Sequence, residues 1–106
     1  MSNFQNLKAM ENVFNSLTVY GAWQVENERE FNDAEKNAVR NATVVKSDYG
    51  KSVMFFMKNG GVTYIPVGRN SVDKVEIGKT YDVNNMRYVR LTKPGESPIS
   101  RVEINV

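Results

Sequence analysis

The sequence predicts an α+β domain in which a helical N-terminal segment precedes a five-stranded antiparallel, strongly curved sheet or small barrel. Two observations support this prediction. Apolar residues near the N-terminus recur with helical spacing, and from Ala42 onward short β-rich runs alternate with turns. In the run 52–58, Val53, Phe55 and Met57 lie on one face and Met54 and Phe56 on the other, so we expect this strand to be covered on both faces, as in a barrel.

Length and composition restrict the possible functions. The 106 residues favour a single domain, with a helical part over 1–41 and a barrel-like part over 42–106. A net charge of +2 permits a nucleic-acid partner without requiring one. The chain contains no cysteine and no histidine, which excludes disulfides, zinc ribbons, thiol chemistry and the commonest general base.

The N-terminal pattern predicts an amphipathic helix with one apolar stripe. This stripe could pack on the protein's own barrel, pair with a second copy, or dock in a groove of a partner protein. These candidate partner-binding residues are Phe4, Leu7, Met10, Phe14 and Leu17.

A second, short helix is expected over about 33–40, because Asn32 and Glu35 have the spacing of a capping box. Before this helix, a short strand is expected over 22–25, and the charged run from Glu26 to Glu30 that follows it is interpreted as a solvated segment. Trp23 is interpreted as an anchor that packs the N-terminal segment onto the barrel.

Five strands are expected near 42–47, 52–58, 62–67, 80–91 and 99–105. Asn59-Gly60-Gly61 predicts a hairpin turn, and Lys93-Pro94-Gly95-Glu96 predicts a second turn before the last strand. Pro66 cannot donate a ladder hydrogen bond, so the third strand should end at a sheet edge or a bulge.

This pattern of five short strands, with a break between the third and fourth, resembles the OB-fold, a small Greek-key barrel. The segment 75–83, VEIGKTYDV, is similar to the start of a barrel strand in OB and SH3-like folds. OB-folds often place a helix between strands three and four, whereas here 69–74 allows barely one turn. The segment 49–67, YGKSVMFFMKNGGVTYIPV, also resembles small uncharacterised proteins of bacteriophages and mobile elements, which implies no particular activity.

The sequence offers little basis for catalysis or cofactor binding. Gly50-Lys51-Ser52 and Gly78-Lys79-Thr80 match the end of a phosphate-binding loop, but Val45 and Asp73 stand where that motif needs its first glycine. No acidic spacing fits a metal loop. We therefore expect no enzymatic activity, no catalytic residue, no metal and no cofactor.

The best functional candidates are basic and aromatic residues around the expected turns and the C-terminal strands. Single-stranded nucleic acid is held by basic grooves with aromatic platforms. The alternative is that the tyrosines are core or rim residues and that the cations only confer solubility. The candidates are Lys46, Tyr49, Lys51, Lys58, Tyr64, Arg87, Tyr88, Arg90, Lys93 and Arg101.

The leading hypothesis is therefore non-catalytic binding of single-stranded nucleic acid. The alternative is a small interaction or assembly protein, such as a viral one, that acts through the N-terminal helix or an exposed sheet edge. No signal peptide or stretch of transmembrane length is visible, so we expect no membrane partner and a cytoplasmic protein, in the host cytoplasm if phage-encoded.

Overall fold

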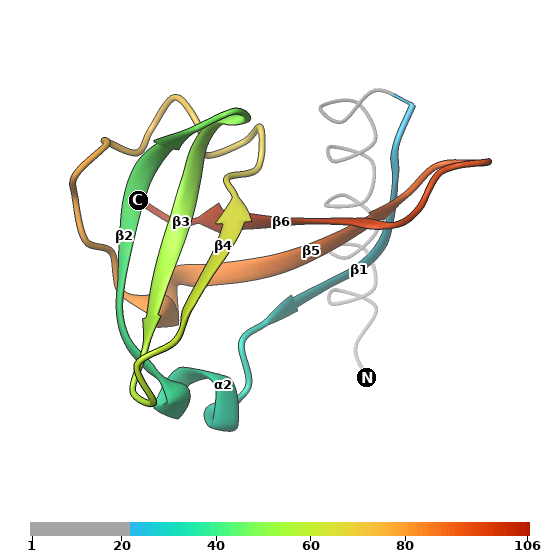
Figure 1. The fold of residues 1–106 in the computed structure, drawn as a ribbon. Coiled ribbons are helices and arrows are strands. Elements are labelled where there is room, and N and C mark those ends of the chain that lie inside the picture. Colours follow the sequence, from blue (N-terminus) through green and yellow to red (C-terminus); the bar gives the residue numbers. More distant parts are fainter. Residues whose placement is uncertain (1–21) are drawn as a thin grey trace, which may run out of the picture.

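The computed structural model describes residues 22–106, which form two three-stranded antiparallel sheets (Figure 1). One sheet has the order β2-β3-β4, with β2 Val39–Ser47, β3 Gly50–Met57 and β4 Val62–Pro66. The other has the order β1-β5-β6, with β1 Gln24–Glu30, β5 Met86–Thr92 and β6 Ile99–Ile104. A short helix, α2 (Asp33–Ala38), links β1 to β2, and a 3-10 turn, η1 (Val83–Asn85), precedes β5. No helix within these residues is long and apolar enough to cross a membrane.

The prediction of one five-stranded sheet or barrel is wrong. The described residues contain two separate sheets that do not close. The short strand expected over 22–25 is the start of β1, which continues through the charged run to Glu30 and pairs with β5, with a bulge between Val25 and Asn27. Its carboxylates meet arginines of β5, with Glu28 and Arg87 at 3.6 Å and Glu26 and Arg90 at 3.6 Å. These cross-strand ion pairs help to explain why a charged segment, which the sequence suggests is a solvated loop, forms a strand.

The predicted helical part over 1–41 needs the same correction, because β1 lies inside it and the only helix in the described part of it is α2. That helix has the predicted capping box: Asn32 Oδ1 accepts from Glu35 N–H, and Glu35 Oε1 accepts from Asn32 N–H. The apolar stripe at 4–17 lies outside the described residues.

The strand predicted over 80–91 starts only at Met86. Asp82 ends the preceding segment, because its carboxylate accepts from Asn84 N–H at 2.9 Å and caps η1. Thr80 belongs to no strand; it forms an isolated bridge to Thr43, and the two hydroxyls share a hydrogen bond at 3.0 Å. The two predicted turns are confirmed, with Gly60 at φ 92° and Gly95 at φ 80°, and Pro66 ends the edge strand β4 as expected.

The main core lies between the two sheets. Val44 and Val53 from one sheet and Met86 and Val102 from the other are almost completely buried, together with Phe55. On the opposite face of β3, Met54 and Phe56 are only half-buried, so the expected cover on both faces is incomplete.

A smaller cluster lies on the other sheet, where Val89 and Leu91 are buried and Trp23, Val25 and Ile99 pack against them. Trp23 therefore packs against the second sheet. The N-terminal segment that Trp23 is expected to anchor lies outside the described residues, so this role stays a prediction.

The two sheets meet where β4 ends beside β6. Val67 and Val102 form a parallel bridge, and Gly68 N–H donates to Val102 O at 2.8 Å. The main-chain positions of β4 that face β6 alternate, so the next one before Gly68 is Pro66, which has no N–H to continue this pairing. Beyond that point β4 and β6 separate, and their facing edges stay open to the surface (Figure 1).

Candidate nucleic-acid interface

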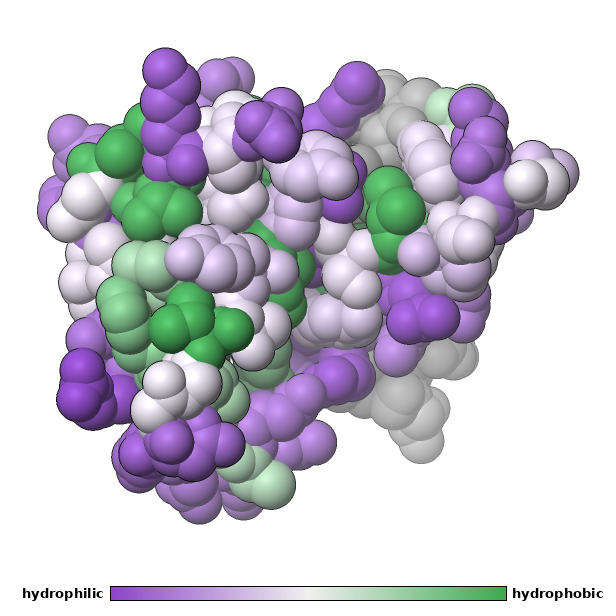
Figure 2. Space-filling view, in the orientation of Figure 1, coloured by the Kyte–Doolittle hydropathy of each residue, from purple (hydrophilic) through white to green (hydrophobic). Residues whose placement is uncertain are grey.

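A groove of about 520 Å³ occupies the space where β4 and β6 separate. Residues 63–66 of β4 and 99–101 of β6 form its two sides, and Tyr49 and Tyr88 complete it. We call this feature the tyrosine groove. Its volume lies within the range of about 300–1,000 Å³ typical of ligand pockets, and no carboxylate of residues 22–106 lines it. On this face, Figure 2 shows apolar side chains gathered over the β2-β3-β4 sheet and strongly polar ones mainly at the periphery.

Tyr49 stands in the turn between β2 and β3 and is 66% exposed. The chain can turn there because Gly50 adopts φ 89°, a conformation that glycine tolerates. The guanidinium of Arg101 lies over the Tyr49 ring, 5.2 Å from its centroid, and its Nη1 donates to Ser100 O at 2.7 Å. This stack holds a cation and an aromatic face together beside the groove.

Tyr64 lies on β4 and is 60% exposed. Side chains alternate along a strand, so Tyr64 leaves one face of the sheet while Thr63 and Ile65 leave the other. In the described part of the chain, its hydroxyl and ring have no hydrogen-bond or ring partner. Tyr64 therefore offers a free aromatic face at the groove.

Tyr88 also lines the groove but is held rigidly. Its hydroxyl shares a hydrogen bond with the Ser100 hydroxyl at 2.5 Å, and its ring meets Phe31 edge-on at 6.4 Å. The guanidinium of Arg29 lies 4.9 Å from the ring centroid. The groove thus combines one fixed tyrosine with two exposed ones.

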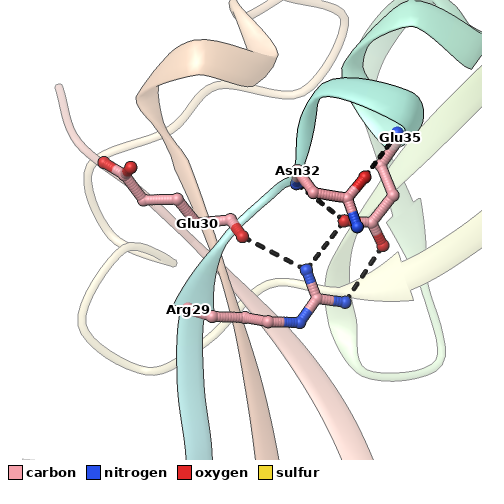
Figure 3. Close-up of polar contacts among 4 residues, drawn as sticks. All are labelled: Arg29, Glu30, Asn32 and Glu35. Atoms are coloured by element: carbon pink, nitrogen blue, oxygen red, sulfur yellow. Dashed lines mark hydrogen bonds and ion pairs between the residues drawn. The ribbon is translucent and has the colours of Figure 1, made fainter.

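A polar network fixes Arg29 beside Tyr88 (Figure 3). Arg29 donates two hydrogen bonds to the Glu35 carboxylate, at 2.7 and 3.0 Å, and a third to Glu30 O at 3.1 Å. These charge-assisted bonds hold the pKa of Glu35 below its ordinary 4.5 and raise the pKa of Arg29. Because Glu35 also caps α2 through Asn32 N–H, the network ties β1, α2 and the groove together.

The free edge of β4 forms part of the same groove. Met57 N–H donates to Gly61 O and Val67 N–H donates to Lys51 O, so main-chain groups at 61, 63, 65 and 67 face β3. Those of Tyr64, which lines the groove, and of Val62, which lies just beyond the lining residues, face the opposite way. Within residues 22–106 they have no hydrogen-bond partner.

The structure brings together four of the ten predicted residues, namely Tyr49, Tyr64, Tyr88 and Arg101. The others lie elsewhere. Lys51 Nζ donates to the carbonyls of Val72 and Val75, both at 2.7 Å, and so holds the loop after β4.

Arg87 and Arg90 pair with β1 from opposite faces of β5, as the alternation along this strand requires. Lys93 lies over the Trp23 ring at 5.7 Å. Lys46 and Lys58 are exposed beyond the groove, near the two ends of the β2–β3 hairpin.

Sequence reasoning missed two contributors, Ser100 and Arg29. Both touch Tyr88, but Arg29 reaches it only through the pairing of β1 with β5. The one available signal was the match between the acidic positions of 26–30 and the arginines of 87–90. Among residues 22–106, no group of three acidic side chains is placed to hold a metal ion.

Compared with known proteins, the chain matches no protein-family model, no curated protein and no solved structure.

Proposed function

We propose that this protein binds single-stranded nucleic acid, without catalysis, in the tyrosine groove. The main support is that one groove is lined by two exposed tyrosines, Tyr49 and Tyr64, and by the guanidinium of Arg101. Unpaired bases stack on such rings, and each stacked base contributes about 1–3 kcal/mol. The proposal is narrower than the sequence hypothesis, because it uses only four of the ten candidates.

The charge of the groove supports this proposal. Arg101 is the only charged residue among 22–106 that lines it, so a phosphate that enters meets a cation and no carboxylate of this part of the chain. Most of the remaining arginines and lysines near it pair with acids or carbonyls. Stacking should therefore dominate the affinity, and the salt dependence should be shallow, corresponding to about one or two phosphate contacts.

The test is fluorescence anisotropy of a labelled oligothymidine of about 12 nucleotides with the full chain. We expect Tyr64→Ala and Tyr49→Ala each to weaken binding by about 5- to 150-fold. Ile77→Ala is the matched control, because Ile77 is 54% exposed but lies outside the groove. Its affinity should match that of the unmodified protein.

A second control separates the groove from net charge. Arg101→Ala and Lys58→Ala each remove one positive charge, but only Arg101 lies on the Tyr49 ring. We expect a clear loss of affinity for Arg101→Ala alone. Equal losses for both variants, or no binding of the oligonucleotide at low salt, would contradict the proposal.

Association of two copies of the chain through β4 is the second candidate. Edge strands usually carry charges that prevent pairing with a foreign strand, and β4, with the sequence VTYIP, has none. Light scattering tests this candidate. A complex that Val62→Lys dissociates would support it, and a monomer at all concentrations would contradict it. The N-terminal stripe at 4–17 stays a prediction for the same role.

A further inference from the structure

We infer that the main chain of β4 binds the Watson–Crick edge of a base in the tyrosine groove, so that the groove accepts only unpaired bases. This inference rests on the proposed function and adds a means of recognition to it. Stacking alone does not require a base to be unpaired at its hydrogen-bonding edge. Hydrogen bonding to a free strand edge does require it, because the edge of the base must have no other hydrogen-bond partner.

Main-chain donors and acceptors alternate along the free edge of β4. Val62 and Tyr64 both direct their N–H and C=O groups away from β3. Along this edge the carbonyl of Val62 is followed by the amide of Tyr64, so an acceptor stands beside a donor. Both groups lack a partner within residues 22–106.

Every base has the complementary arrangement on its Watson–Crick edge. Thymine has N3–H beside O4, guanine has N1–H beside O6, and adenine and cytosine have an amino group beside a ring nitrogen. Any of these donor–acceptor pairs can bond to Val62 C=O and Tyr64 N–H. In a duplex the same atoms are already bonded to the opposite strand, so paired bases are excluded.

The side chains around this edge suit a flat ring. A base bonded to the edge extends the plane of the β2-β3-β4 sheet. Tyr64 leaves that sheet on one face, and Thr63 and Ile65 leave it on the other. Across the groove, Ser100 O already accepts from Arg101, which keeps the guanidinium at the β6 side. Side chains of β4 therefore stand on both sides of the plane in which the base would lie.

This mode of binding predicts that nucleic acids of different base sequence bind with similar affinity, because one acceptor–donor pair of the main chain fits all four bases. Side chains of β4 supply stacking, and its backbone supplies the requirement for an unpaired edge.

The test compares two ligands on the unmodified protein: oligothymidine and the same oligomer built from N3-methylthymidine. The methyl group blocks N3–H but leaves the ring faces and phosphates in place. We expect at least about fivefold weaker binding of the methylated oligomer, because one polar group of the edge loses its partner. Equal affinity for the two oligomers would overturn the inference and leave the proposed function standing.

The protein side of the test uses Tyr64→Pro with Tyr64→Ala as its matched control. Both variants lack the ring, but only proline also lacks the N–H, which takes no part in the ladder to β3. Tyr64→Pro should bind unmodified oligothymidine several-fold more weakly than Tyr64→Ala, because it also loses the hydrogen bond from the amide at position 64 to a carbonyl oxygen of the base. Equal affinity of Tyr64→Pro and Tyr64→Ala for oligothymidine would contradict the inference, and failure of the unmodified protein to bind oligothymidine would overturn both proposals. A thermal unfolding midpoint for each variant checks that it is folded.

Discussion

The two ends of the junction between β4 and β6 differ completely in how their polar groups are satisfied. At the closed end, Gly68 bonds to Val102, and the buried Ser71 hydroxyl donates to Glu103 at 2.6 Å while accepting from Ile104 N–H at 2.8 Å. At the open end, Val62 and Tyr64 leave their outward main-chain groups without partners among the described residues. One pair of strands therefore provides both a structural joint and a binding edge.

This difference indicates that stability and binding can be changed separately. The closed end is made of buried, mutually bonded groups, whose loss should destabilise the fold. The open end is made of exposed rings and unpaired amides, which contribute little to folding. Substitutions at the two ends should therefore change different measurements.

The largest expected effect is that of Lys51→Met at the closed end. Lys51 Nζ bonds to two carbonyls of the loop that carries Ser71, and methionine keeps the length of the side chain without the donors. We expect the free energy of unfolding in urea to fall by about 2–3 kcal/mol. Oligonucleotide affinity should stay within about twofold under conditions where the variant is folded.

Lys46→Met is the matched control for this prediction. Lys46 lies opposite Lys51 in the β2–β3 ladder but is exposed and has no partner within residues 22–106. Its substitution should change stability by no more than about 0.5 kcal/mol. Equal destabilisation by the two variants would show that the Lys51 contacts are not what holds this loop.

A smaller effect is expected at the open end, where Glu35 fixes Arg29 beside Tyr88. Since the pKa of Glu35 is lowered in the folded protein, its stabilising contribution is complete above the ordinary value of 4.5. It is lost as the pH falls through the lowered pKa. Both side chains of the pair are more than a third exposed, 38% and 36%, so solvent screening limits the contribution to about 0.5–1 kcal/mol.

Glu35→Gln tests this assignment. The variant should be less stable than the unmodified protein at neutral pH, and the difference should shrink as the pH falls below the ordinary pKa. The measurement is the thermal unfolding midpoint of both proteins across that range. A difference that does not depend on pH would show that the charge of Glu35 is not the source of its contribution, since glutamine can also complete the capping box.

The sequence allowed local features to be predicted, because they depend on neighbouring residues. The capping box of Asn32 and Glu35, the turn at Gly60 and the edge position of Pro66 were all predicted and observed. The pairing of β1 with β5 was missed, because its ion pairs join residues that are far apart along the chain.

Which residues make up the candidate site was hard to predict for the same reason, because they come from strands that are far apart along the chain. Exposed basic and aromatic residues could be picked out, but which of them converge depends on where β4 and β6 separate. Lys51 illustrates this limit, since its sequence neighbourhood resembles that of an exposed turn lysine. Only the folded loop shows that the ammonium group of Lys51 donates hydrogen bonds to the carbonyls of Val72 and Val75.

The smallest effect on stability, and the most direct test of the comparison, is expected for Pro66→Ala. Pro66 is the position at which pairing between β4 and β6 stops, and alanine supplies the missing N–H facing Ser100 O. We expect the bridge at Val67 and Val102 to extend by one step, at the expense of the contact between Arg101 and Ser100. The net change in stability should be within about 0.5 kcal/mol, because the new bond offsets the lost rigidity of proline.

Amide hydrogen exchange measures this extension directly. Slow exchange of the new amide at position 66, with weaker oligonucleotide binding, is the expected result, because a longer bridge narrows the groove. Pro98→Ala is the matched control, since Pro98 is exposed and lies outside both strands. Fast exchange of the amide at position 66 with unchanged binding would mean that the shape of the core, and not the missing N–H of Pro66, separates the two strands.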